Sequence, residues 1–149
     1  MVEPQLFRGT PEREDLIHGT IFAMRGLRNA LENKNTVREV ANCNISVASE
    51  WIIRTGMQLY KEARNGEPLL DDDPSMKITG PLYEGKPGLC LERWLFWKSR
   101  FSRVTDEVDD EVAQMAQQAA GEMERVEKVM RKRAMDLSTG ETHHRLKSF

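Results

Sequence analysis

The feature that most constrains the fold is an apolar stripe near the C-terminal end of the chain. Apolar residues recur there in alternating steps of four and three positions, at Val112, Ala116, Ala119, Met123, Val126 and Met130. This spacing places them on one face of an α-helix, whereas a β-strand would alternate every second residue. We therefore predict a helix from about Asp109 to about Met135 that packs along this Ala- and Met-rich face.

Three further segments show helical spacing. The first begins at Thr10-Pro11-Glu12, which is typical of a helix N-terminus, and should end near Glu32. The second should run from about Asn44 to the stop signal Asn65-Gly66. The third should begin near Cys90. Its predicted inward stripe, which Leu91 and Leu95 should widen, comprises Cys90, Trp94, Trp97, Phe101 and Val104.

These segments predict a single-domain, all-α bundle of about four helices with one long loop. A chain of 149 residues can bury a core without disulfides or a metal. We expect residues 1–9 to be a flexible N-terminus, residues 10–135 to form the helical domain and residues 136–149 to be a flexible tail. The loop, Glu67 to Lys86, is rich in Pro and Gly and is unusually long for a compact domain.

Composition narrows the classes of partner. The formal net charge of −2 gives no reason to expect nucleic acid or an anionic membrane. No segment approaches the roughly 18 consecutive apolar residues that would cross a bilayer. We expect a cytoplasmic protein, with the nucleus as the alternative compartment. Cys43 and Cys90 show no metal-binding spacing, and we expect both to be reduced and buried.

The stretch GPLYEGKPGLCLERWLFWKSRF, Gly80 to Phe101, carries the most specific pattern in the chain. It resembles the C-terminal signature of a mainly fungal family known as domain of unknown function three-six-three-two. Ile21 to Glu32 and Ser49 to Ala63 are similar to the same family, and the resemblance extends to Val126. Members of that family are usually longer at the N-terminus, which implies that this chain corresponds to the C-terminal half. The resemblance implies a fold and no activity.

No pattern of acidic residues, histidines or glycines predicts a metal or cofactor site. The consecutive carboxylates of Asp71 to Asp73 lack the spacing of a calcium-binding loop. His18, His143 and His144 have no partner at ligand spacing. The Gly80 to Gly88 segment lacks a Walker pattern, so its glycines and prolines indicate turns. We expect no metal and no cofactor.

Two charged groups have a structural and a functional interpretation. Glu92 and Arg93 could form an acid–base pair, but we expect Glu92 to serve the helix N-terminus and Arg93 to reach the loop. The basic stretch Arg125 to Arg133 could bind nucleic acid, but Glu124 and Glu127 favour a solvated helix end.

Two functions stay open, and the sequence does not decide whether the protein is an enzyme. The first is a helical interaction module that self-associates or binds a protein partner, with the first or last helix at the interface. Its basis is a bundle that would lack half of its family's chain and leave an apolar face uncovered. The second is a cofactor-free protein that binds a hydrophobic small molecule, or a cyclase- or isomerase-like enzyme of a fungal natural-product pathway.

Aromatic residues supply the candidate binding site. A pocket between the second and third helices would be walled by Trp51, Tyr60, Trp94 and Trp97. The full set of candidate binding residues comprises Trp51, Tyr60, Tyr83, Arg93, Trp94, Phe96 and Trp97. The spacing of Trp94, Trp97 and Phe101 is equally what a helix needs to form a core. Phe96 lies off that stripe, so it belongs either to a second buried layer or to an exposed contact.

Overall fold

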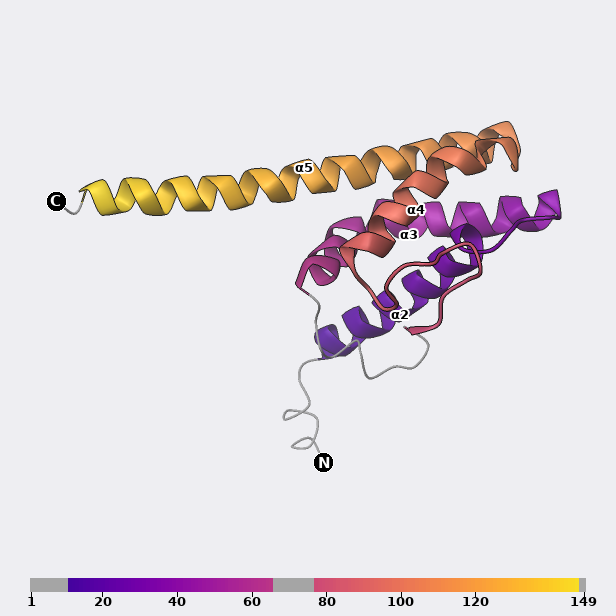
Figure 1. Ribbon diagram of the computed structural model, residues 1–149, viewed down its shortest axis with the longest axis horizontal. Helices are drawn as coiled ribbons and strands as arrows, with labels where there is room; N and C mark the ends of the chain where they lie inside the picture. Colours follow the sequence, from indigo (N-terminus) through magenta and orange to yellow (C-terminus); the bar gives the residue numbers. More distant parts are fainter. Residues whose placement is uncertain (1–10, 66–76, 148–149) are drawn as a thin grey trace, which may run out of the picture.

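The protein is a bundle of α-helices (Figure 1). The computed structural model describes residues 11–65 and 77–147, with side chains described for residues 19–65 and 77–137. In order, these residues form α2 (Pro11–Leu31), α3 (Arg38–Asn65), α4 (Leu91–Arg103), the 3-10 helix η3 (Val104–Asp106) and α5 (Asp110–Lys147). No strand occurs in the described ranges, so the predicted all-α class is confirmed.

α3 is the central helix of the bundle. It packs most extensively against α5 and, on another side, against α2, while α4 lies against α5 and contacts α3 and α2 more lightly. The predicted apolar stripes form the core: in α3 the buried positions include Ile45, Ala48, Ile52, Leu59 and Ala63, and in α5 they include Ala116, Ala119, Met123 and Val126. Gly56 of α3 lets α5 approach, since Val126 Cγ2 lies 3.8 Å from the place a Cβ would occupy.

The start of α3 was predicted wrongly. The helix begins at Arg38 rather than near Asn44. Its first turns are stabilised from outside, because the Asn42 amide donates to Asp109 Oδ2 at 2.9 Å and accepts from the Asp109 backbone N–H at 2.9 Å. Arg38 adds an ion pair to the same carboxylate at 3.4 Å. A partner 67 residues away along the chain is invisible to local sequence patterns.

The buried face of α4 is narrower than predicted. Trp94, Trp97 and Phe101 are fully buried, as expected, but Leu91 and Leu95 are exposed and do not widen that face. Cys90 is the N-cap residue and makes no side-chain cap hydrogen bond. A thiol is a weak acceptor, so the first turn of α4 has no side-chain oxygen as its cap at this position.

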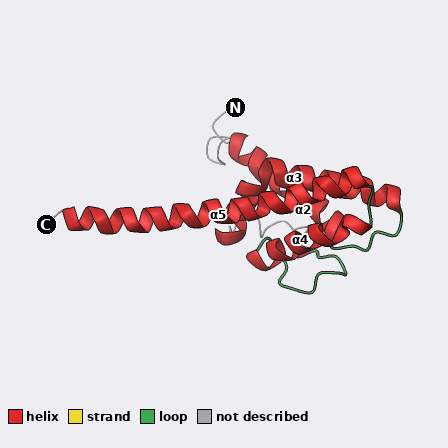
Figure 2. Cartoon of the chain, turned by 90° about the horizontal axis from the view of Figure 1, so that it is seen from above, coloured by secondary structure: helices red, strands yellow, loops and turns green. Residues whose placement is uncertain are grey.

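α5 continues as a helix well beyond the body of the bundle (Figure 2). It was expected to end near Met135 and runs to Lys147. Its packing against the other helices fades at Met130, which is half-buried, and residues 131–137 are all exposed. We call residues 131–147 the α5 arm.

The second part of the predicted loop folds back onto the helices, and the loop extends past Lys86 as far as residue 90, so that residues 77–90 connect to α4. Gly80 to Tyr83 forms a turn closed by a 3.1 Å bond from the Tyr83 N–H to the Gly80 carbonyl, with Pro81 at its second position. Gly88 has φ +83°, a left-handed conformation that favours glycine. The first part of that loop, including Asp71 to Asp73, and the expected flexible residues 1–9 lie outside the described residues.

Candidate functional site

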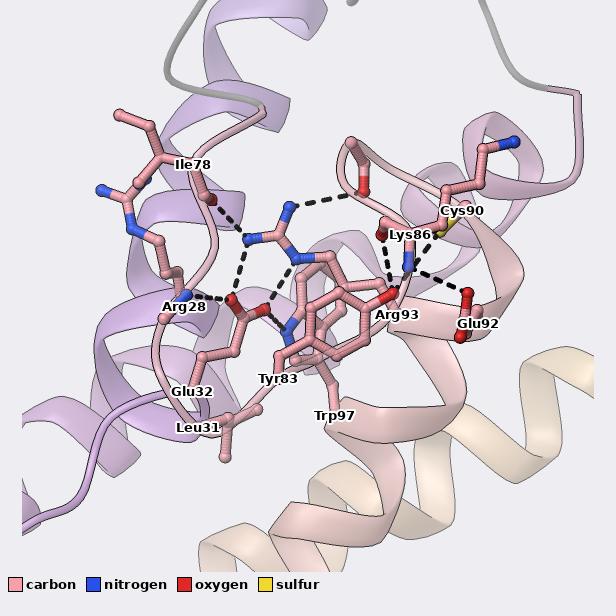
Figure 3. A network of polar contacts seen from close by, with 12 residues as sticks. Arg28, Leu31, Glu32, Ile78, Tyr83, Lys86, Cys90, Glu92, Arg93 and Trp97 are labelled. Carbon is pink, nitrogen blue, oxygen red and sulfur yellow. Dashed lines mark hydrogen bonds and ion pairs between the residues drawn. The ribbon is translucent and has the colours of Figure 1, made fainter.

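A buried polar network centres on the carboxylate of Glu32, at the end of α2 (Figure 3). Arg93 of α4 donates to it twice, from Nε to Oε2 at 2.7 Å and from Nη2 to Oε1 at 2.9 Å. Trp97 Nε1 donates to Oε2 at 2.6 Å, and the Gly80 backbone N–H donates to Oε1 at 2.9 Å. We call Glu32, Gly80, Arg93 and Trp97 the Glu32 clasp, because it joins α2, α4 and the loop.

The clasp forms where α2 has to end. The last carbonyls of a helix lack intrahelical partners, and here other segments supply them. The Leu82 N–H donates to the Glu32 carbonyl at 2.9 Å, and Arg100 Nε donates to the Leu31 carbonyl at 2.9 Å. The side-chain amides of Asn33 and Asn35 reach back to the carbonyls of Arg28 and Ala30. The end of α2 is therefore held by the loop and by α4.

The guanidinium of Arg93 is enclosed on all sides. Besides Glu32 it donates to the carbonyls of Ile78 at 2.9 Å and Gly88 at 3.3 Å, and its Cζ lies 5.6 Å and 5.5 Å from the ring centroids of Tyr83 and Trp97. The side chains of Arg93 and Glu32 are 1% and 0% exposed. A buried ion pair with these additional hydrogen bonds has few free positions for a ligand, so the clasp acts as a structural joint.

Tyr83 closes the outer side of the joint. Its hydroxyl donates to the Lys86 carbonyl at 2.7 Å and lies 3.9 Å from Cys90 Sγ. Burial, followed by the neighbouring Cys90 and Glu92, raises the pKa of the Tyr83 phenol well above its usual value. Glu92 lies in the first turn of α4, as predicted, and it also holds the loop, because the Lys86 N–H donates to Glu92 Oε1 at 3.0 Å.

The structure brings four of the seven candidate binding residues together at the clasp. Arg93 and Trp97 contact Glu32, as described above, and Tyr83 packs against Arg93. Phe96 is half-buried and packs on Tyr83 with ring centroids 5.1 Å apart. It is therefore intermediate between the two expected positions, a second buried layer and an exposed contact. The expectation that Arg93 reaches the loop is confirmed.

Tyr60 and Trp94 form a second, separate aromatic pair. Their ring centroids are 5.1 Å apart, and Trp94 Nε1 donates to Glu127 Oε2 of α5 at 2.9 Å. Lys98 Nζ donates to Glu127 Oε1 at 3.0 Å. Because Trp94 and Trp97 are fully buried, these indoles belong to the core rather than to the wall of an open pocket.

Trp51 lies elsewhere, against α2. A Cβ added to Gly26 would come within 3.0 Å of the Trp51 indole, so Gly26 makes room for this ring. An open groove of about 440 Å³ runs beside it, lined on α3 by Ser46, Val47, Glu50, Trp51 and Arg54. The structure therefore separates Trp51 from the other candidate aromatics and gives it the groove.

The remaining candidates with described side chains are Cys43 and Cys90, and neither lies in a reactive arrangement. Cys43 is exposed, against expectation, because it faces away from Ala41 and Ile45, which point into the core. Cys90 is partly exposed. Among the described residues no three His, Cys, Asp or Glu side chains gather as metal ligands. The side chains of His18, His143 and His144 lie outside the described residues.

Glu32 is the residue that sequence reasoning missed. It stands before Asn33-Lys34-Asn35 and looks like an ordinary polar helix end. The available signal was Arg93, one residue from the core position Trp94, since a cation held there needs a buried carboxylate. Nothing local identified which carboxylate it would be.

This geometry defines a class of protein: a small all-α bundle whose helices and loop are joined by a buried carboxylate–guanidinium pair. The chain belongs to the family described as "Protein of unknown function (DUF3632)", whose model matches residues 8–101. The match confirms the resemblance but ends before Val126, so all of α5 lies beyond it. No curated protein and no solved structure matches the chain. No helix in the described ranges is long and apolar enough to span a membrane.

Proposed function

We propose that the protein is a helical interaction module that works by self-association. The observation that carries this proposal is the α5 arm, which leaves the bundle without covering its apolar side chains. Met135 and Leu137 are 69% and 70% exposed. Figure 1 shows the arm running clear of α2, α3 and α4, so a second helix has room to lie along it.

Helix energetics support a partner for the arm. Most helical stability in proteins comes from packing one face of the helix against another element, and the exposed side chains of residues 131–137 have no such packing within the chain. The arm contains Ser138, Thr139, Gly140 and Thr142 in succession or nearly so. Each of these residues costs about 0.5–1 kcal/mol relative to Ala in a helix interior. A helix of this composition gains its stability from packing against another element.

The test is the mass of the full chain in solution, measured by light scattering and native mass spectrometry over a concentration series. We expect a dimer that dissociates on dilution. Leu137→Glu should shift the equilibrium to monomer, and Gln118→Glu, at an exposed position on the packed part of α5, should not. A monomeric mass at every concentration would refute self-association.

One observation favours a second candidate function, the binding of a hydrophobic small molecule. The groove beside Trp51 is large enough for a small ligand and has apolar walls at Val47 and Trp51, with Glu50 and Arg54 at its polar edge. Native mass spectrometry should then show the chain with a bound small mass. Trp51→Ala should lose that mass, whereas Val40→Ala, on the same helix outside the groove, should retain it.

A further inference from the structure

The charges on α5 fall into two blocks of opposite sign. Residues 125–133, RVEKVMRKR, contain five Lys or Arg side chains and one Glu. Residues 136–144, DLSTGETHH, contain no Lys or Arg and two acidic side chains. The cations at Arg131, Lys132 and Arg133 are exposed, as is Asp136. The two blocks have equal length and meet near Ala134 and Met135.

We propose that the α5 arm binds the α5 arm of a second copy in antiparallel orientation, with the two-fold axis beside Ala134 and Met135. This inference rests on the proposed self-association and specifies its surface. An axis at that point sets residues 125–133 opposite residues 136–144 of the partner subunit. A parallel pairing in register would set the five-cation block against itself, which like-charge repulsion disfavours.

The apolar side chains agree with this register. Met130, Ala134 and Leu137 are spaced four and three residues apart, so they share one face of the helix. With the axis beside Ala134, Leu137 of the partner subunit falls between Met130 and Ala134, as side chains interdigitate in helix pairs. Arg133 lies on one flank of this face. Asp136 of the partner subunit stands at the same level but on the outer side of its helix, so the two charges attract across the interface without direct contact. Symmetry repeats this attraction, so one interface has two of them.

Site-specific disulfides test the orientation. In a Cys43→Ser, Cys90→Ser background, Ala134→Cys places two thiols almost at the axis, and mild oxidation should link the dimer. Met130→Cys is the matched control, because its two copies would stand about 13 Å apart along the helices at a rise of 1.5 Å per residue. A disulfide requires Cα atoms within about 7 Å, so Met130→Cys should stay unlinked.

Charge exchange tests the register without cysteines. Arg133→Glu should raise the dimer Kd about two- to five-fold, since two symmetric attractions between exposed charges become repulsions. Combining it with Asp136→Arg should restore the wild-type Kd, because the attractions return with their signs exchanged. Both side chains are exposed in the single chain, so neither change should disturb its fold.

The outcomes separate this inference from the proposed function. A dimer in which only Ala134→Cys links, and in which the double charge exchange restores affinity, supports both. A dimer in which neither cysteine links, or both link, retains self-association but overturns the antiparallel arm pairing. A chain that stays monomeric at every concentration overturns both.

Discussion

The Glu32 clasp and the α5 arm are two helix ends with opposite surroundings. At the end of α2, one carboxylate receives four hydrogen bonds from α4 and the loop, and its side chain is 0% exposed. Beyond Met130, α5 shows only exposed side chains as far as residue 137. The end of α2 finds its hydrogen-bond partners within the chain, whereas the α5 arm leaves side chains exposed that a partner could cover. The position of that spare surface indicates where binding should be sought.

The largest effect is expected at the clasp. Arg93→Met would leave the Glu32 carboxylate buried without its cation, and we expect a loss of about 3–5 kcal/mol in the free energy of unfolding. Chemical denaturation measures this value. Arg54→Met, which breaks the exposed pair with Glu50, is the control and should change stability by less than about 0.5 kcal/mol. Equal losses in the two variants would contradict the role of the clasp.

Two glycines allow the same substitution in the clasp and at an exposed position on the packed part of α5. In Gly80→Ala the new Cβ would overlap the Glu32 carbonyl oxygen and lie 2.6 Å from Glu32 Cβ, so the loop would have to move. We expect a loss of about 1–3 kcal/mol, as for other overpacked sites. In Gly121→Ala the Cβ meets nothing within 4 Å, and a helix interior should gain about 0.5–1 kcal/mol. Thermal unfolding of both variants measures the two stability changes, and a gain in Gly80→Ala or a loss in Gly121→Ala would contradict this prediction.

The pH dependence of stability tests the burial of Tyr83, whose ring packs against Arg93 of the clasp. The folded protein raises the pKa of Tyr83, so folding favours the protonated phenol. Its contribution is complete below the unfolded pKa of about 10 and is lost as pH rises beyond it toward the folded pKa, at up to about 1.4 kcal/mol per pH unit. Wild type should therefore lose stability above pH 10 more steeply than Tyr83→Phe. Denaturation at several alkaline pH values measures the two slopes, and parallel slopes would argue against a buried phenol.

The smallest effect is expected in the arm. Met135→Ala should change the free energy of unfolding of the single chain by less than about 0.5 kcal/mol, because its side chain is exposed. Met123→Ala, at a fully buried position of the same helix, should lose about 2–5 kcal/mol. Denaturation at a concentration too low for association compares them. A large loss in Met135→Ala would mean that the arm packs on its own bundle.

The local sequence pattern correctly predicted the buried positions wherever packing follows helical spacing. The stripes of α3 and α5 and the buried positions Trp94, Trp97 and Phe101 follow directly from spacings of three and four. Pattern failed where a distant partner decides the structure. α3 begins early because Asp109 pairs with Asn42, and Glu32 is buried because Arg93 and Trp97 reach it from α4. Such pairings depend on the tertiary arrangement, which single-sequence spacing does not contain.

The candidate site was foreseen only in part. Arg93 and its aromatic neighbours lie together as one cluster, but the carboxylate at its centre came from a segment with no recognisable signal. Trp51 was grouped with Trp94 and Trp97 as a wall of the expected pocket between the second and third helices. Gly26 draws Trp51 toward α2 instead. The absence of a side chain at Gly26 of α2 therefore leaves the space that the Trp51 indole of α3 occupies.

The long sequence separation within the clasp bears on the order of folding. Gly80, Arg93 and Trp97 lie 48, 61 and 65 residues from Glu32 along the chain. Helices form from local contacts within about a microsecond, but a loop of this length must close before the carboxylate can leave water. The clasp should therefore assemble after the individual helices. Substitutions in it should act mainly on the unfolding rate, and the protein's lifetime in the folded state would then depend on one buried carboxylate.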